Sequence, residues 1–240
     1  MKKQIGILVA LVAAATLPFE AMAFKTFTLV GGNIHEQISE QALTHASVGL
    51  KPAAFKLVDK GNTSQDLPPD VFVDSHHFDN CKLDETQAFI EDCYAKISKD
   101  ATTASSDLAK RQNILKTFGA LLHPIQDFYS HSNYLELALK SNSAFTPDDL
   151  PLVDWKQLTN SNVSATVASV RTGFFSVLEL SSRKQALAKV KSDNLLIAGT
   201  DYLNDDDYNK LATFDQRIAF ATNPQLSFLH NDLNKDNAKT

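Results

Sequence analysis

Cysteine is scarce in this chain, which contains only Cys81 and Cys93. A zinc site built on paired CxxC motifs is therefore excluded. An oxidising compartment would permit one disulfide between these two residues, and we predict that bridge. The alternative is a pair of buried thiols.

Several motifs of common enzyme classes are also missing. The sequence has no glycine-rich phosphate loop, no nucleophile elbow and no repeat array. Its net charge of −5 and isoelectric point near 5.8 argue against a surface for general nucleic-acid binding. Alternating β-branched runs with hairpin turns are nearly absent, which excludes a β-rich fold.

The only long apolar run lies at the start of the chain and is too short to cross a bilayer. It covers residues 5–17, follows Lys2 and Lys3, and precedes the small-residue site Ala21-Met22-Ala23. This pattern predicts a secretory signal peptide over residues 1–23. The mature chain, residues 24–240, would then begin at Phe24, form one domain without a transmembrane segment, and be periplasmic or secreted.

Helical spacing dominates the remaining sequence. We expect an all-α, single-domain helical bundle with polar connections at residues 62–70 and 142–153. Pro124 falls within one expected helix, where it would either kink the helix or mark a helix start. The expected helices cover residues 35–48, 83–97, 105–140, 163–190 (one or two helices) and 206–221.

His123, Asp127 and His131 recur at intervals of four residues. On an α-helix this spacing puts all three side chains on one stripe. Two imidazoles and a carboxylate form a donor set that Zn²⁺ takes readily. The pattern therefore indicates a zinc site on a largely buried helix, and the alternative is a hydrogen-bonded helix face that carries two histidines.

Other polar residues extend this constellation. His35, His76 and His77 are candidate ligands, whereas His45 is interpreted as a surface or packing histidine. Near the C-terminus, His230 remains an unassigned possibility. Asp66 and Asp70 bracket the Pro68-Pro69 loop, and acidic loop residues of this kind are often simply solvated.

In several ordered patches the chain resembles the zinc-dependent phospholipase C family, which is related in fold to the fungal-type single-strand nucleases. It is most similar to the branch that includes the heterokaryon-incompatibility protein Het-C and bacterial secreted phospholipases. The resemblance rests on residues 32–38, 76–80, 121–134 and 233–236. It implies an α-helical enzyme that holds two to three Zn²⁺ ions.

Transferred by position, the resemblance implies a ligand set in this chain. Phe24 would bind through its α-amino nitrogen and carbonyl oxygen, together with His35. His77 and His123 would share a second ion, and Asp127 would bridge the two ions. His131 would bind the remaining ion, for which the sequence lacks the family's His-x-x-x-Glu pair. His77 is preferred to His76 because a phenylalanine follows it.

The function implied by the resemblance is hydrolysis of phosphatidylcholine-type phospholipids to diacylglycerol and a phosphorylated head group. Zinc would lower the pKa of a bound water, and Asp66, with Asp70 as the second choice, would orient or deprotonate that water. One alternative is a zinc nuclease or nucleotidase on the same scaffold, which the lone Trp155 does not favour. The other is a non-catalytic helical protein with a structural zinc site.

Overall fold

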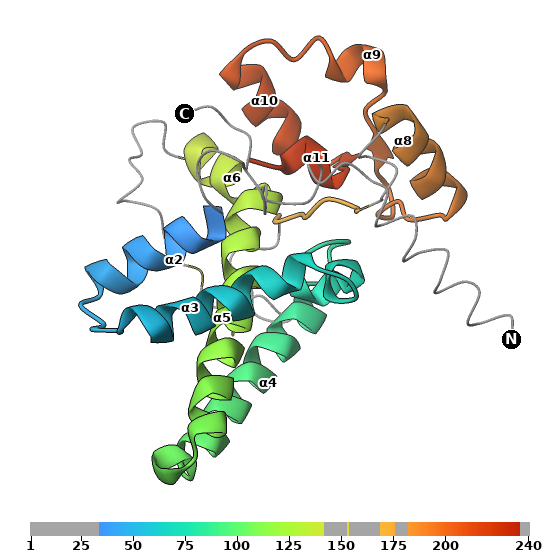
Figure 1. Cartoon of the computed structure of the whole chain (residues 1–240). Coiled ribbons are helices and arrows are strands. Elements are labelled where there is room, and N and C mark those ends of the chain that lie inside the picture. Colours follow the sequence, from blue (N-terminus) through green and yellow to red (C-terminus); the bar gives the residue numbers. More distant parts are fainter. Residues whose placement is uncertain (1–33, 142–152, 154–168, 176–181, 236–240) are drawn as a thin grey trace, which may run out of the picture. The chain divides into compact units, whose positions relative to one another are not determined.

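The computed structural model describes residues 34–141, 153, 169–175 and 182–235 (Figure 1). The predicted signal peptide and Phe24 lie outside the described residues. So do most of the predicted connection at 142–153 and much of the predicted helical region at 163–190. Export of the chain and the role of its freed amino group therefore stay predictions.

The described chain is mostly helical, and the predicted all-α class is confirmed. Its only named strands are β1 (Asp201–Tyr202) and β2 (Leu226–Ser227), which form a short parallel pair within the described residues. The α-helices are α2 (Ile34–His45), α3 (Pro52–Thr63), α4 (Leu83–Ala101), α5 (Leu108–His131), α6 (Tyr134–Ser141), α8 (Arg183–Ser192), α9 (Asp205–Tyr208), α10 (Phe214–Ala221) and α11 (His230–Leu233). The 3₁₀ turns are η2 (Ser64–Asp66), η3 (Asp70–Phe72), η4 (Asp74–His76) and η5 (Ala104–Ser106).

The helix expected over residues 105–140 is two helices, α5 and α6. The break follows from side chains that compete for the backbone: Ser132 accepts a hydrogen bond from the amide of Tyr134 at 3.2 Å. Asn133 is fixed from outside the helix, because its side chain accepts from the amide of Arg171 at 2.7 Å and donates to the carbonyl of Ala221 at 2.8 Å. Pro124 lies inside α5, so the alternative that it starts a helix is wrong.

The chain divides into two compact units. Of the described residues, the first unit contains 34–73 and 93–123, and the second contains 74–92 and those from 124 to 235. Helices α4 and α5 each contribute to both units. In the first unit α2 packs against α3, as Figure 1 shows.

Two glycines allow α3 and α5 to approach backbone to backbone in the first unit. A Cβ built on Gly119 of α5 would overlap the carbonyl oxygen of Val58 in α3, and one built on Gly61 would overlap the carbonyl oxygen of Lys116. Only glycine, which has no Cβ, allows two backbones to come this close. The approach brings Asn62, the residue after Gly61, to the side of α5 that carries His123.

The second unit contains two apolar clusters that support its C-terminal helices. Phe174, Ala186, Val190 and Leu229 belong to one cluster, which joins α8 to the segment before α11. The other cluster includes Phe220 of α10, Phe228 and Leu233 of α11. Burial of large apolar side chains of this kind contributes about 1.5–3 kcal/mol each.

The predicted disulfide between Cys81 and Cys93 is wrong, because both residues are thiols in this structure. The Cys81 thiol donates to the carbonyl oxygen of Thr172 at a sulfur–oxygen distance of 3.2 Å, and its sulfur accepts from the Thr172 amide at 3.4 Å. Burial raises the pKa of the Cys81 thiol above its ordinary value. A thiol with a raised pKa carries little thiolate at neutral pH and is correspondingly unreactive.

Asp59 of α3 carries a carboxyl group that burial and the neighbouring Glu36 keep partly protonated near pH 6. Its pKa is raised from 3.8 to about 6. The folded state binds this proton more tightly than the unfolded state does. Above pH 6 the carboxyl group is ionised in both states, and the full cost is then subtracted from the free energy of unfolding. That cost disappears as the pH falls from about 6 to 3.8.

We expect Asp59→Asn to raise the free energy of unfolding at pH 7.5. A shift of this size in a fully buried group corresponds to about 3 kcal/mol, and solvent screening at this partly exposed site reduces the expected gain to about 1 kcal/mol. Urea denaturation at pH 7.5 and pH 4 measures it, with Glu40→Gln on the exposed face of α2 as the control. An equal gain at both pH values would contradict the assignment.

Candidate metal centres

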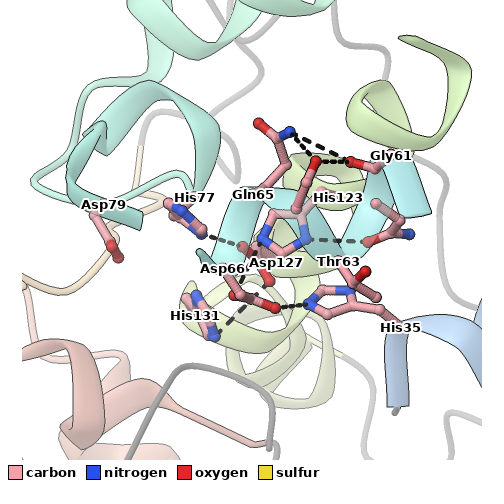
Figure 2. A network of polar contacts seen from close by, with 12 residues as sticks. His35, Gly61, Thr63, Gln65, Asp66, His77, Asp79, His123, Asp127 and His131 are labelled. Carbon is pink, nitrogen blue, oxygen red and sulfur yellow. Dashed lines mark hydrogen bonds and ion pairs between the residues drawn. The ribbon is translucent and has the colours of Figure 1, made fainter. Parts of the chain in front are cut away.

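The first unit encloses two imidazoles around one carboxylate, as Figure 2 shows. The three residues, His35 of α2, Asp66 of η2 and His123 of α5, are all fully buried. Nε2 of His35 lies 3.8 Å from Oδ2 of Asp66, and Nε2 of His123 lies 3.5 Å from Oδ1 of the same carboxylate. The two imidazole rings are 4.1 Å apart between centroids.

Asn62 fixes the orientation of the His123 ring. Its side-chain oxygen lies 3.0 Å from Nδ1 of His123, and its amide nitrogen donates to the hydroxyl of Ser39 at 3.2 Å. An amide oxygen accepts hydrogen bonds but cannot donate them, so Nδ1 of His123 carries the proton. In a neutral ring Nε2 then presents its lone pair toward Asp66.

This arrangement has two chemical interpretations. A protonated His123 would form a buried ion pair with Asp66, whereas a neutral His123 would point one electron pair at a carboxylate and need a cation between them. Metal-ligating histidines typically donate their second ring nitrogen to a fixed acceptor, as His123 does to Asn62. Imidazole and carboxylate donors suit zinc. The cluster therefore fits a divalent metal.

The second unit contains the predicted residues His77, Asp127 and His131. Nδ1 of His77 donates to Oδ2 of Asp127 at 3.0 Å, which Figure 2 marks with a dashed line. Nε2 of His131 lies 4.0 Å from Oδ1 of Asp127, one turn earlier on α5. The preference for His77 over His76 agrees with this geometry, since the ring of His76 instead packs against Phe89 at 4.1 Å.

A further group capable of holding a metal ion consists of Asp79, His131 and His230. One ligand atom from each of these buried residues lies within 4.8 Å of the other two. Nδ1 of His230 donates to Oδ1 of Asp79 at 2.7 Å, and the rings of His131 and His230 are 4.1 Å apart. The set holds two imidazoles and one carboxylate, the donors found in catalytic zinc sites of the His₂Glu type.

Local backbone geometry places Asp79 in this group. Phe78 and Asn80, which flank it, both have a φ of 56°, in the left-handed region. Such conformations cost about 1–3 kcal/mol in non-glycine residues and occur often at functional sites. The amide of Asn80 donates to the carbonyl of Gly173 at 2.9 Å, and the amide of His230 donates to Phe174 at 3.1 Å. Residues 173–174 therefore connect the Asp79 turn to α11.

The predicted site residues can now be placed. His35, Asp66 and His123 meet in the first unit; His77 and Asp127 meet in the second, where His131 joins Asp79 and His230. The predicted sharing of one ion by His77 and His123, and the bridging role of Asp127, join residues of different units and stay predictions. Asp66 is fully buried, whereas the second choice, Asp70, is only half-buried.

The sequence did not assign Asp79 or His230. His230 was an isolated histidine in the sequence, and Asp79 was one acidic residue in a polar cluster. The only hint that Asp79 is a ligand lay in the short segment His76-His77-Phe78-Asp79-Asn80, where this aspartate follows a candidate ligand by two residues. No spacing rule connects that segment to a residue 151 positions later.

Comparison with known families finds a match to a family other than the zinc-dependent phospholipases C. Residues 35–149 match the VWA7 N-terminal domain. The match covers slightly less than half of the chain and contains every candidate ligand described above except Phe24 and His230. No curated protein and no solved structure matches the chain significantly.

This match overturns the resemblance to the zinc-dependent phospholipase C family, because residues 35–149 are similar to a different family. The prediction of a phospholipase C that cleaves phosphatidylcholine-type lipids is therefore wrong. In the described part of the chain, no helix has the length and apolar character needed to cross a membrane. The buried Asp79–His131–His230 group does not depend on the family relationship, and it can hold a metal ion.

Proposed function

We propose that this chain is a zinc-binding protein whose two units each hold a metal ion in a buried cluster of histidine and aspartate. His35, Asp66 and His123 would bind in the first unit, and Asp79, His131 and His230 in the second. The observation that carries the proposal is the hydrogen bond between His123 Nδ1 and Asn62 Oδ1, which leaves Nε2 of His123 facing Asp66.

Burial supports this proposal. The carboxylates of Asp66 and Asp79 and their neighbouring imidazoles are almost completely inaccessible to solvent. Isolated buried charges are costly, and a metal ion that several groups share offsets that cost. Zinc is the preferred ion because imidazole nitrogen is a poor ligand for Mg²⁺ and Ca²⁺, which favour oxygen donors.

Zinc binding is expected to stabilise the full-length protein strongly. After the protein has been treated with a chelator, added Zn²⁺ should bind again, and elemental analysis should find at least two zinc ions per chain. Free zinc at about 1,000 times its dissociation constant would add about 4 kcal/mol per site to the free energy of unfolding. Mg²⁺ at the same concentration is the control and should leave the melting temperature unchanged. Substoichiometric zinc with an unshifted melting temperature would overturn the proposal.

A second candidate function is hydrolysis at the centre in the second unit. One observation favours it: among the described residues, three side chains form the Asp79–His131–His230 group, and the cluster in the first unit has the same number. Structural zinc sites usually have four protein ligands, whereas catalytic sites have three and keep a position for water or substrate. Bound zinc would supply Lewis acidity and lower the pKa of a coordinated water.

Zinc-dependent turnover separates these two functions. Zinc-loaded protein would be incubated with chromogenic phosphate and carboxylate esters, and His230→Ala would provide the matched control. Ester hydrolysis that is lost in His230→Ala, and in the wild type when chelator is added, supports catalysis at the centre in the second unit. Full zinc content without turnover of either ester class supports a non-catalytic zinc protein.

A further inference from the structure

Helix α11, which carries His230, is a single turn and depends on outside contacts. Isolated helices of this length are unstable in water because nucleation is costly. Asp232 holds the turn together: its buried carboxylate accepts from the Leu229 amide at 3.0 Å, and its own amide donates to the Leu229 carbonyl at 3.0 Å. The position of His230 therefore depends on Asp232.

Arg183, the first residue of α8, in turn holds Asp232. Its Nε donates to Oδ1 of Asp232 at 2.8 Å and its Nη2 donates to Oδ2 at 3.2 Å. A guanidinium that binds both carboxylate oxygens fixes direction as well as distance. Figure 1 shows α8 near α11 within the second unit.

The remaining contacts of Arg183 hold the guanidinium in place. Nη1 donates to Oδ1 of Asp205 at 2.7 Å, and Nη2 donates to the carbonyl of Leu203 at 2.9 Å. The guanidinium carbon lies 4.2 Å from the centre of the Tyr208 ring, within the range of a cation–π interaction. Contacts to α9 and to the residue after β1 thus hold Arg183 in a fixed orientation toward Asp232.

We propose that Arg183 is a positioning residue for the metal ligand His230 and acts through Asp232. The inference rests on the proposed zinc site in the second unit. Ligands must be held within about 0.5 Å of their productive geometry. Loss of the groups that orient a ligand typically lowers metal affinity about 10–100-fold. In this role Arg183 and Asp232 act through the position of His230 and do not need to contact the metal.

The test is a zinc titration of full-length Arg183→Lys with a competing chromophoric chelator. Lysine keeps the positive charge but has no two-point fork. We expect the affinity of one zinc site to fall about 10–100-fold while the site in the first unit keeps its affinity. Lys189→Gln is the matched control, because it removes an exposed ion pair with Asp193 on the same helix and touches none of the contacts of Arg183. Its zinc affinity should stay within about threefold of the wild-type value.

Melting temperatures in excess chelator separate positioning from general stability. A purely structural role would lower the apo melting temperature of Arg183→Lys and leave the affinities of both zinc sites at the wild-type value, and that result would overturn the inference. Asp232→Asn is the second variant if Arg183→Lys does not fold, and the same loss at one site is expected.

His230→Ala distinguishes failure of this inference from failure of the proposed site. If His230→Ala binds as many zinc ions as the wild type, then His230 is not a ligand and the proposed site in the second unit is wrong. If His230→Ala loses one ion while Arg183→Lys keeps the wild-type affinity, the site stands and the positioning role of Arg183 is wrong.

Discussion

Gly119→Ala is expected to destabilise the protein by about 3 kcal/mol. The new methyl group would overlap the carbonyl oxygen of Val58, and the backbone amide of Asn62 lies close to the same position. These neighbours are backbone atoms of α3, so no side-chain rotation relieves the overlap, and α3 must move away from α5. Alanine normally favours a helix over glycine by about 1 kcal/mol, and that gain is far too small to compensate.

Thermal unfolding measures the effect. For a chain of this size the expected loss corresponds to a melting temperature about 10 °C lower. Gly49→Ala is the matched control, because a Cβ at Gly49 meets nothing within 4 Å. It should be neutral or stabilising by up to about 1 kcal/mol. Wild-type stability in Gly119→Ala would show that α3 and α5 do not approach backbone to backbone.

The same substitution connects packing to metal binding. Displacement of α3 would move Asn62 away from His123 and release the ring from its fixed orientation. We therefore expect Gly119→Ala to weaken zinc binding in the first unit, whereas the site in the second unit, which takes no ligand from α3, would keep its affinity.

Much of the helical framework could be predicted from local patterns. The periodicity before and after Pro124 indicated a helix, and α5 does run through that residue. Helix α3 was missed, although Pro52 at its first position is a favourable start. Lys56, Lys60 and Gly61 interrupt the apolar pattern of that segment, and its stability comes from packing against α2 and α5 that a local window does not contain.

The candidate site was only partly predictable for a related reason. The four-residue spacing of His123, Asp127 and His131 correctly identified buried polar residues on one helix. In the structure each of the three has different partners: His123 contacts Asp66, Asp127 contacts His77, and His131 contacts His230. Helical spacing fixes the direction in which side chains point, but the folding of distant loops decides which groups meet them.

His123→Ala is expected to remove the zinc ion of the first unit and to destabilise the protein even without metal. The mutation deletes a fully buried imidazole that lies 3.0 Å from Asn62 Oδ1 and 3.5 Å from Asp66 Oδ1. Removing one member of a buried charged pair costs about 3–5 kcal/mol because the other member stays buried without compensation.

Elemental analysis and chemical denaturation with and without chelator measure the two effects separately. His45→Ala is the control: it removes an exposed histidine of α2 and should change stability by less than about 0.5 kcal/mol and zinc content not at all. The comparison also decides between the two chemical interpretations of the cluster. If His123 and Asp66 form only an ion pair, His123→Ala loses stability but keeps the wild-type number of zinc ions. If they share a metal, the stabilisation that zinc gives to the first unit disappears together with one bound ion.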